Sequence, residues 1–220
     1  MPEGIPPISF TTPSPRGYLY ACASVDPPGR APFVRRSARR ERMLAQWRAL
    51  AQDLTELDEV ACATVFEAVL IPPIQGGPRH DVLMLVQTTS PAQLAAVPVE
   101  KLRADLVMPA SNTRRIGDTD ATAQGTFLFN HFTAPDPEAG VAAWEGLAAW
   151  YTAKTGVDNS TLLRPVEESG PYAFVNYVRL PGSAPAFLLN QVLRPSFHRY
   201  VRSTLKANGM VAMPILCRPA

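Results

Sequence analysis

The chain has 220 residues, of which 46% are hydrophobic and 18% charged, a composition typical of a globular protein with a buried core. This length suits one large domain or two modules of about 100 residues each. The net charge of +2 is too close to neutral to indicate nucleic-acid binding.

Three cysteines, Cys22, Cys62 and Cys217, lie far apart and form no CxxC pair. Their spacing indicates free thiols in a reducing compartment rather than a disulfide framework or a zinc site. The chain shows no signal-peptide pattern at its start and no run of 18 apolar residues. We therefore expect a cytoplasmic protein without a membrane or nucleic-acid partner.

The first half begins with an arm, residues 1–15, which contains five prolines and is expected to be extended. After it, runs rich in β-branched and aromatic residues predict strands, and apolar residues at helical spacing predict a helix. The predicted elements are a strand at 18–25, a helix at 36–57, and strands at 60–70 and 81–88. Residues 94–106 are weakly helical and are interrupted at Pro98.

A polar, aperiodic stretch at 109–123 predicts a linker, after which the order of elements repeats. The helix of the second half begins at Pro135-Asp136 and ends at Gly156, where an acidic start and a glycine stop are favourable. The strands of this half are predicted at 126–133, 160–166, 173–180 and 211–216, with a second helical segment at 184–205.

The two halves also share residues at a constant distance. Leu70, Pro72, Gly77, Pro78 and Val82 recur 93 residues later as Leu163, Pro165, Gly170, Pro171 and Val175. Upstream, residues 17–22 resemble 125–130, an alignment that places Cys22 opposite Asn130. A strand, loop and strand found twice indicate a duplicated module whose copies pack on one another.

Each half therefore reads β-α-β-β-α-β, the ferredoxin-like order, in which helices cover only one face of an antiparallel sheet. Two such sheets can close into a barrel. On this order and repeat the chain resembles the dimeric α+β barrel superfamily, in a tandem form. The resemblance implies an α+β fold of two ferredoxin-like repeats, 16–108 and 124–220, that form an intramolecular barrel. Such a pseudo-dimer is expected to be a monomer or to pair into a homodimer.

Within that superfamily, the second half is similar to the antibiotic-biosynthesis monooxygenases and their heme-degrading relatives. In the heme-degrading branch, an Asn on the first strand and a His on the late helix flank a cavity between sheet and helices. Asn130 and His198 fall at the matching places, and the resemblance implies catalytic roles for both and heme ligation for His198. The branch also has a Trp ten residues before the His, and this chain has Leu188 there.

The chemistry of these side chains leaves two interpretations open. A neutral His can ligate heme iron or accept a proton, and an amide can hold a reacting oxygen. Alternatively, His198 is a surface or capping residue, and Asn130 satisfies a backbone group at a bulge.

Further candidates for substrate binding lie beside these positions. His131 follows Asn130, so alternation places the two side chains on opposite faces of one strand. Asn176 and Tyr177 alternate in the same way on the third strand, and Arg164 is placed to receive a carboxylate.

Taken together, the sequence predicts a flavin-independent, monooxygenase-like enzyme with a cavity for a small hydrophobic or aromatic molecule. The cofactor stays open: heme is compatible with the resemblance, whereas flavin, NAD and zinc lack their motifs. One alternative is a ligand-binding, stress or scaffold barrel without catalysis, which an internal barrel packed solid would favour. In another, the arm 1–15 is a segment for docking a partner.

Overall fold

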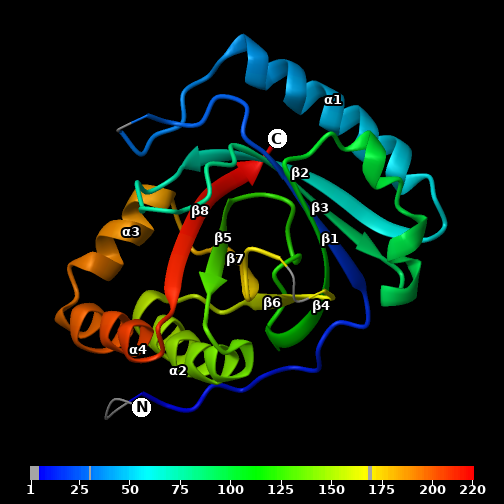
Figure 1. Cartoon of the computed structure of the whole chain (residues 1–220). Helices are drawn as coiled ribbons and strands as arrows, with labels where there is room; N and C mark the ends of the chain where they lie inside the picture. The colour runs from blue at the N-terminus through cyan, green and yellow to red at the C-terminus, as the bar shows by residue number, and fades with distance from the viewer. Residues whose placement is uncertain (1–4, 30, 168–169) are drawn as a thin grey trace.

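The computed structural model describes residues 5–29, 31–167 and 170–220. Within these ranges, eight strands close into one antiparallel barrel in the order β1-β3-β2-β8-β5-β7-β6-β4 (Figure 1). The first half supplies β1 (Gly17–Ala23), β2 (Val60–Leu70), β3 (Val82–Thr88) and β4 (Leu106–Ile116). The second half supplies β5 (Thr126–Thr133), β6 (Ser160–Pro165), β7 (Phe174–Leu180) and β8 (Val211–Pro219). The predicted tandem α+β barrel is confirmed.

Two seams join the halves and leave the barrel without a free edge. The last strand of each half pairs with its own first strand and also with the other half, so that β8 meets β2 and β4 meets β6. At these seams Phe66 lies opposite Pro219 and Asn112 opposite Leu163. Each half thus completes the sheet of the other, which explains why the duplicated unit is stable in one chain.

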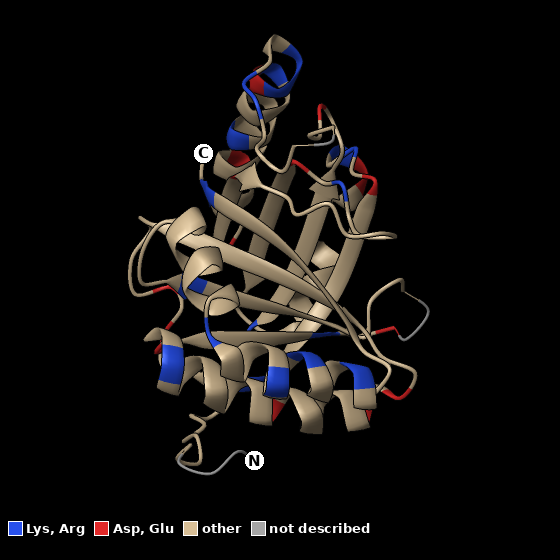
Figure 2. Ribbon diagram, turned by 90° about the vertical axis from the view of Figure 1, so that its left-hand side faces the viewer, with Lys and Arg blue, Asp and Glu red and all other residues tan. Residues whose placement is uncertain are grey.

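The helices lie outside the barrel and are unequally divided between the halves (Figures 1 and 2). The first sheet carries α1 (Ala38–Thr55), followed later by the short 3-10 segments η1 (Pro91–Ala96) and η2 (Val99–Lys101), where the helical pattern was weak. The second carries α2 (Pro137–Thr155), α3 (Ala184–Val192), the π-helical turn η3 (Phe197–Val201) and α4 (Arg202–Ala207). Among the described residues, no helix has the length and apolar character needed to cross a membrane.

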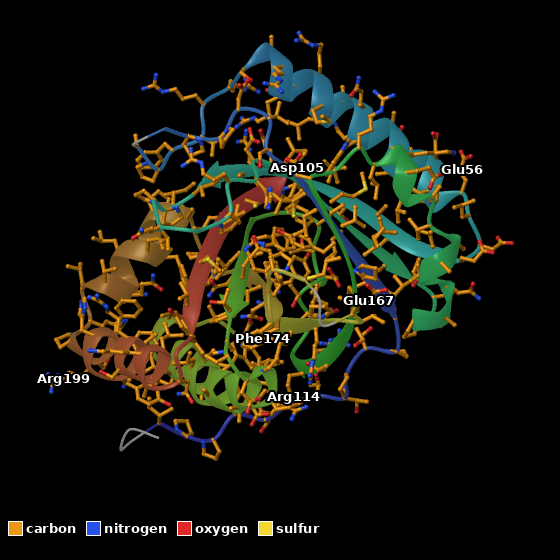
Figure 3. The ribbon with its side chains drawn as sticks, in the orientation of Figure 1. Glu56, Asp105, Arg114, Glu167, Phe174 and Arg199 are labelled. Atoms are coloured by element: carbon orange, nitrogen blue, oxygen red, sulfur yellow. The ribbon has the colours of Figure 1, made fainter. Side chains whose placement is uncertain are left out.

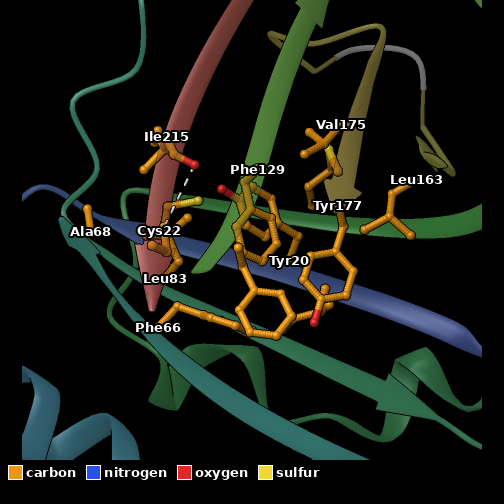
Figure 4. Packing of buried hydrophobic residues seen from close by; sticks show 14 of the residues in the cluster. Tyr20, Cys22, Phe66, Ala68, Leu83, Phe129, Leu163, Val175, Tyr177 and Ile215 are labelled. Atoms are coloured by element: carbon orange, nitrogen blue, oxygen red, sulfur yellow. Dashed lines mark hydrogen bonds between the residues drawn. The ribbon is translucent and has the colours of Figure 1, made fainter. Parts of the chain in front are cut away.

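The barrel interior is a packed aromatic core (Figures 3 and 4). Tyr20 stacks on Phe129 with ring centroids 5.1 Å apart, and Phe129 stacks on Tyr177 at 4.9 Å. Phe66 meets Phe129 edge-on at 5.1 Å. These ring contacts fill this part of the barrel interior and stabilise it.

The strand pairing corrects the predicted alignment of the two halves. Leu83 and Val175 both lie in the barrel interior, where Leu83 faces Cys22 and Val175 faces His131. The structural counterpart of Cys22 is therefore His131, and the predicted match with Asn130 was wrong by one residue. Such a slip is easy to make in sequence because β1 is apolar on both faces, so alternation gives no register there.

One local prediction also needs correction. Residues 109–116, predicted to open a linker, belong to β4, because this strand fills a seam of the barrel. Trp150, which lies off the apolar stripe of its helix, is fully buried and donates a hydrogen bond from Nε1 to Ser196 Oγ over 3.2 Å. The segment Ser196–Val201 packs on Trp150, on a side of α2 that lies outside its apolar stripe.

The described part of the arm, residues 5–15, packs on its own chain. Ile5 is buried against α2 and η3 residues, and Ile8 and Phe10 lie partly buried beside Trp144 and its neighbours. The Thr11 amide donates to Arg115 O of β4 over 2.9 Å. The arm thus covers an apolar face of this chain, which is a different use from the predicted docking of a partner.

Candidate functional site: an apolar cavity beneath the helices of the second half

A cavity lies between the outer face of the second sheet and the helices that cover it. It adjoins a wider surface groove between α3 and the segment after β2, and seven residues line both spaces. The inner cavity has a volume of about 50 Å³ and the groove about 550 Å³. The lining residues that they share are Leu128, Asn130, Tyr151, Phe187, Val201, Leu205 and Ala212.

Asn130 lies at the junction of cavity and groove. It occupies the middle of β5, where alternation turns Phe129 and His131 into the barrel and Asn130 toward the helices. Its amide oxygen Oδ1 is buried and has no hydrogen-bond partner. The neighbouring position on β8 is Pro214, which has no N–H to donate. A buried acceptor without a donor is uncommon in folded proteins, and this one belongs to a residue that lines the cavity.

A second amide lies directly beside it. Asn176 of β7 is the cross-strand neighbour of Asn130, and its Oδ1 accepts a hydrogen bond from Ser160 Oγ over 2.5 Å. Thr152 of α2 also lines the cavity, and its buried Oγ1 has no partner. The wall therefore carries two unsatisfied oxygen atoms, Asn130 Oδ1 and Thr152 Oγ1, in apolar surroundings.

A hydrogen bond between Tyr151 and Gln191 connects two helices where the cavity and the groove adjoin. Tyr151 OH donates to Gln191 Oε1 over 3.0 Å, which ties α2 to α3. Burial raises the pKa of Tyr151, so the phenol stays neutral at physiological pH. In the described lining of both spaces, there is no Asp, Glu, Lys, Arg, His or Cys. The site is thus suited to a neutral molecule that is largely apolar.

Of the six predicted site residues, the structure brings only Asn130 and Asn176 together. Tyr177 points into the barrel, and its OH donates to Asp120 Oδ1 over 3.1 Å. His131 is fully buried inside the barrel, with Nε2 2.9 Å from Tyr20 OH and Nδ1 3.0 Å from Met213 O. The predicted alternation of Asn130 with His131 and of Asn176 with Tyr177 is confirmed. Neither His131 nor Tyr177 reaches the cavity, because the strand geometry turns both inward.

His198 and Arg164 also lie outside the lining. His198 is exposed on η3, with Nε2 2.8 Å from Val192 O, so it links the turn to the end of α3. The expectation that His198 and Asn130 flank one cavity is not met, because the π-helical turn directs this side chain outward. Arg164 of β6 forms an ion pair with Glu138 in the first turn of α2.

The residues missed in sequence are Ser160, Thr152 and the pair of Tyr151 with Gln191. Helical spacing could have predicted Thr152, because Trp144, Ala148 and Thr152 follow one another on one face of α2. Ser160 and Gln191 carry no such signal, because their partners lie 16 and 40 residues away in the sequence.

The first half has no equivalent polar wall. The strand register assigns Ala21 and Met84 to the places of Asn130 and Asn176, and both lie in the apolar core beneath α1. Trp47 and Leu44 of α1 fill the space above them. Apart from Ile116 of β4, the described lining of the cavity comes from the second half, where two amides and a looser helical cover break the symmetry of the barrel.

The sequence matches no protein-family model and no curated protein. Solved structures do share the fold, all at low identity. An anthrone oxidase-like protein superposes with a TM-score of 0.60 at 14% identity, over 93% of each chain. A mutant chlorite dismutase from Candidatus Nitrospira defluvii gives 0.51 at 13% identity, over 94% of this chain and 93% of its own. A heme-binding protein from Thermus thermophilus gives 0.50 at 10% identity, over 97% and 94%. The chain thus has the fold of the dimeric α+β barrel superfamily.

The fold of these neighbours raises heme as a cofactor, and the cavity can be tested for it. Heme iron needs an axial ligand such as His, Cys or Met, and its two propionates are usually met by cations. The described lining offers none of these side chains, and Tyr151 is neutral and bonded to Gln191. The donor set of this cavity therefore does not fit heme. The described residues also contain no cluster of side chains suited to a metal ion.

Proposed function

We propose that the second-half cavity binds a neutral aromatic molecule that carries a hydroxyl or enol group. We further propose that the protein oxidises this molecule with dioxygen without a cofactor, as a monooxygenase-like enzyme. The observation that carries the proposal is the unpaired Oδ1 of Asn130 at the junction of an apolar cavity and an apolar groove. The fold shared with an anthrone oxidase-like protein supports the substrate class.

The energetics of a buried amide support a binding role. Leaving such a group without a hydrogen bond costs about 1–3 kcal/mol, which the folded protein must offset elsewhere. A hydroxyl donor on the ligand removes this penalty when it binds, while its rings occupy the roomier groove. Specificity follows, because an analogue without the hydroxyl leaves Oδ1 unsatisfied.

A tricyclic ketone of the anthrone type illustrates the reaction. Its enol tautomer donates its O–H to Asn130 Oδ1, which orients the ring and favours the electron-rich form. Dioxygen adds at the ring carbon opposite the hydroxyl, and loss of water from the hydroperoxide leaves a second carbonyl. The reaction balances as R₂CH₂ + O₂ → R₂C=O + H₂O. The apolar lining excludes solvent from the reacting carbon, and the chain supplies orientation rather than a base.

The free thiols of the chain support a reducing location such as the cytoplasm, as its cysteine spacing predicted. Cys22 and Cys217 are buried without a disulfide.

The test is a titration with anthrone under nitrogen, followed through tryptophan fluorescence, to which Trp144 of the cavity lining contributes. Oxygen uptake and quinone absorbance are then followed in air against a protein-free blank, because anthrone oxidises slowly by itself. Asn130→Leu should weaken binding and slow oxidation by at least about tenfold, the value of one lost hydrogen bond. His198→Ala serves as the control, because its exposed ring does not contact the cavity, and should change neither quantity. A loss of activity in His198→Ala with Asn130→Leu unaffected would overturn the proposal.

A second function is favoured by the lining itself. No side chain among the described cavity residues can act as a general base near neutral pH, and the barrel interior is packed solid. Both facts suit a ligand-binding barrel without catalysis. Saturable binding of anthrone without oxygen uptake above the blank would support this function.

A further inference from the structure

The face that surrounds the mouth of the groove differs in charge from the rest of the protein. From residue 170 to the end of the sequence there is no Asp or Glu, although the whole chain has 19 acidic residues. Four of the basic residues in this stretch lie on the segment after α3, namely Arg194, Arg199, Arg202 and Lys206. None of the ion pairs found among the described residues involves these four. These four side chains therefore have no carboxylate paired with them among the described residues.

Figure 2 looks onto this face and shows the basic segments along the helices at its lower edge. In Figure 3 the side chain of Arg199 extends away from the barrel into solvent. Arg199, Arg202 and Lys206 follow one another at helical spacing on η3 and α4, so their fields add over one side of this run.

The same face exposes large apolar side chains at the mouth of the groove. Phe33 and Leu189 are each 57% exposed and line the groove, as does the half-exposed Val192. Leu193, at the end of α3, is 71% exposed. Exposed aliphatic and aromatic side chains beside cations are typical of surfaces that rest in the headgroup region of a bilayer.

We infer that this face docks on an anionic phospholipid membrane, so that the groove opens toward the lipid. The positive charge of this face favours an anionic lipid over a second copy of the chain. Two copies of the chain would bring the same arginines together, so a dimer through this face is disfavoured. Phosphate headgroups complement the arginines, while Leu189 and Leu193 enter the acyl boundary. A molecule dissolved in the bilayer could then enter the groove without crossing water.

The sequence predicted no membrane partner because it contains no segment that could span a bilayer. Docking on a membrane surface needs no such segment. Docking on lipid rests on the proposed function only for the path of the ligand. It requires no activity, so the two can be tested independently.

The experiment is co-sedimentation of the full chain with vesicles of phosphatidylcholine alone or with 30 mol% phosphatidylglycerol. We expect partition into the anionic vesicles at low salt and its loss at high salt. Arg199→Gln/Arg202→Gln should lower the partition coefficient by about fivefold for each arginine removed. Leu189→Ser/Leu193→Ser should lower it by at least tenfold, even though the charge is unchanged.

Two arginines of α1, on the far side of the barrel, provide the matched control. Arg42→Gln/Arg48→Gln removes the same charge as the test variant, and should leave partition within twofold of the wild type. Circular dichroism and thermal melting establish that each variant is folded. An equal loss in the α1 control, equal partition into neutral vesicles, or no partition at all would overturn the inference. Retained anthrone binding in such a case would show that the proposed function stands without it.

Discussion

Asn130 and Asn176 lie opposite each other on β5 and β7, and they differ in one respect that bears on function. The Oδ1 atom of Asn176 accepts a hydrogen bond from Ser160 Oγ, whereas that of Asn130 is buried and unpaired. Two identical side chains on one wall therefore have opposite effects on stability. Asn176 is satisfied within the protein, whereas Asn130 lacks a partner there, as the proposed ligand role requires.

This difference predicts opposite results for the same substitution. Asn130→Leu should raise the free energy of unfolding by about 1–3 kcal/mol, because it removes a buried polar group without a partner. Asn176→Leu should lower it by about the same amount, because the Ser160 hydroxyl would lose its acceptor. Urea denaturation of both variants without ligand measures the effect. Equal destabilisation by the two variants would show that Asn130 is satisfied in the free protein.

The order of elements and the duplication predicted the fold well, because hydrophobic period and turn residues are local signals. The sequence predicted two polar residues of the candidate site, but it also placed His198 there. Asn130 and Asn176 were found because a polar residue on an otherwise apolar strand stands out. His198 was placed at the cavity by family resemblance, and only the π-helical turn after Pro195 turns it outward. Strand register failed in the same way, since Cys22 and His131 are matched only by their pairing with Leu83 and Val175.

A substitution that fills the cavity should separate ligand binding from stability. Ala212 of β8 lines both the cavity and the groove, so Ala212→Leu would place its added atoms in existing space. We expect the free energy of unfolding to change by less than about 1.5 kcal/mol, while the affinity for anthrone falls at least tenfold. The control is Ala110→Leu, inside the packed barrel, which should cost about 1–3 kcal/mol. Unchanged affinity in Ala212→Leu would place the ligand elsewhere.

His131 should make stability depend on pH. Burial lowers the pKa of its imidazole to about 3, whereas the unfolded chain titrates near the ordinary value of about 6.5. Between these values the unfolded state binds one more proton than the folded state. Stability is therefore full above about pH 6.5 and falls as the pH drops toward 3, by at most about 1.4 kcal/mol per pH unit.

The measurement is the free energy of unfolding from pH 7.5 to 4.5 for the wild type and for His131→Gln. The glutamine cannot take up the proton, so the difference between the two curves should narrow as the pH falls. Carboxylates elsewhere titrate alike in both proteins and cancel in this comparison. Parallel curves would contradict a neutral, buried His131.

Arg40 offers a last test, in a buried ion pair of the first half. Its guanidinium contacts Glu67 at 3.3 Å, yet its Nε and second terminal nitrogen are buried without partners. Glu67 also pairs with Arg218 at 2.6 Å, so it keeps a cation if Arg40 is removed. Arg40→Met should therefore leave stability within about 1 kcal/mol of the wild type or increase it, because a poorly satisfied buried charge is replaced by an apolar chain. Glu67→Gln should cost about 3–5 kcal/mol, because Arg40 would remain buried without its counter-ion. The double variant Arg40→Met/Glu67→Gln should recover most of that loss in urea denaturation. If it does not, Glu67 stabilises the barrel through Arg218, and the buried guanidinium contributes little.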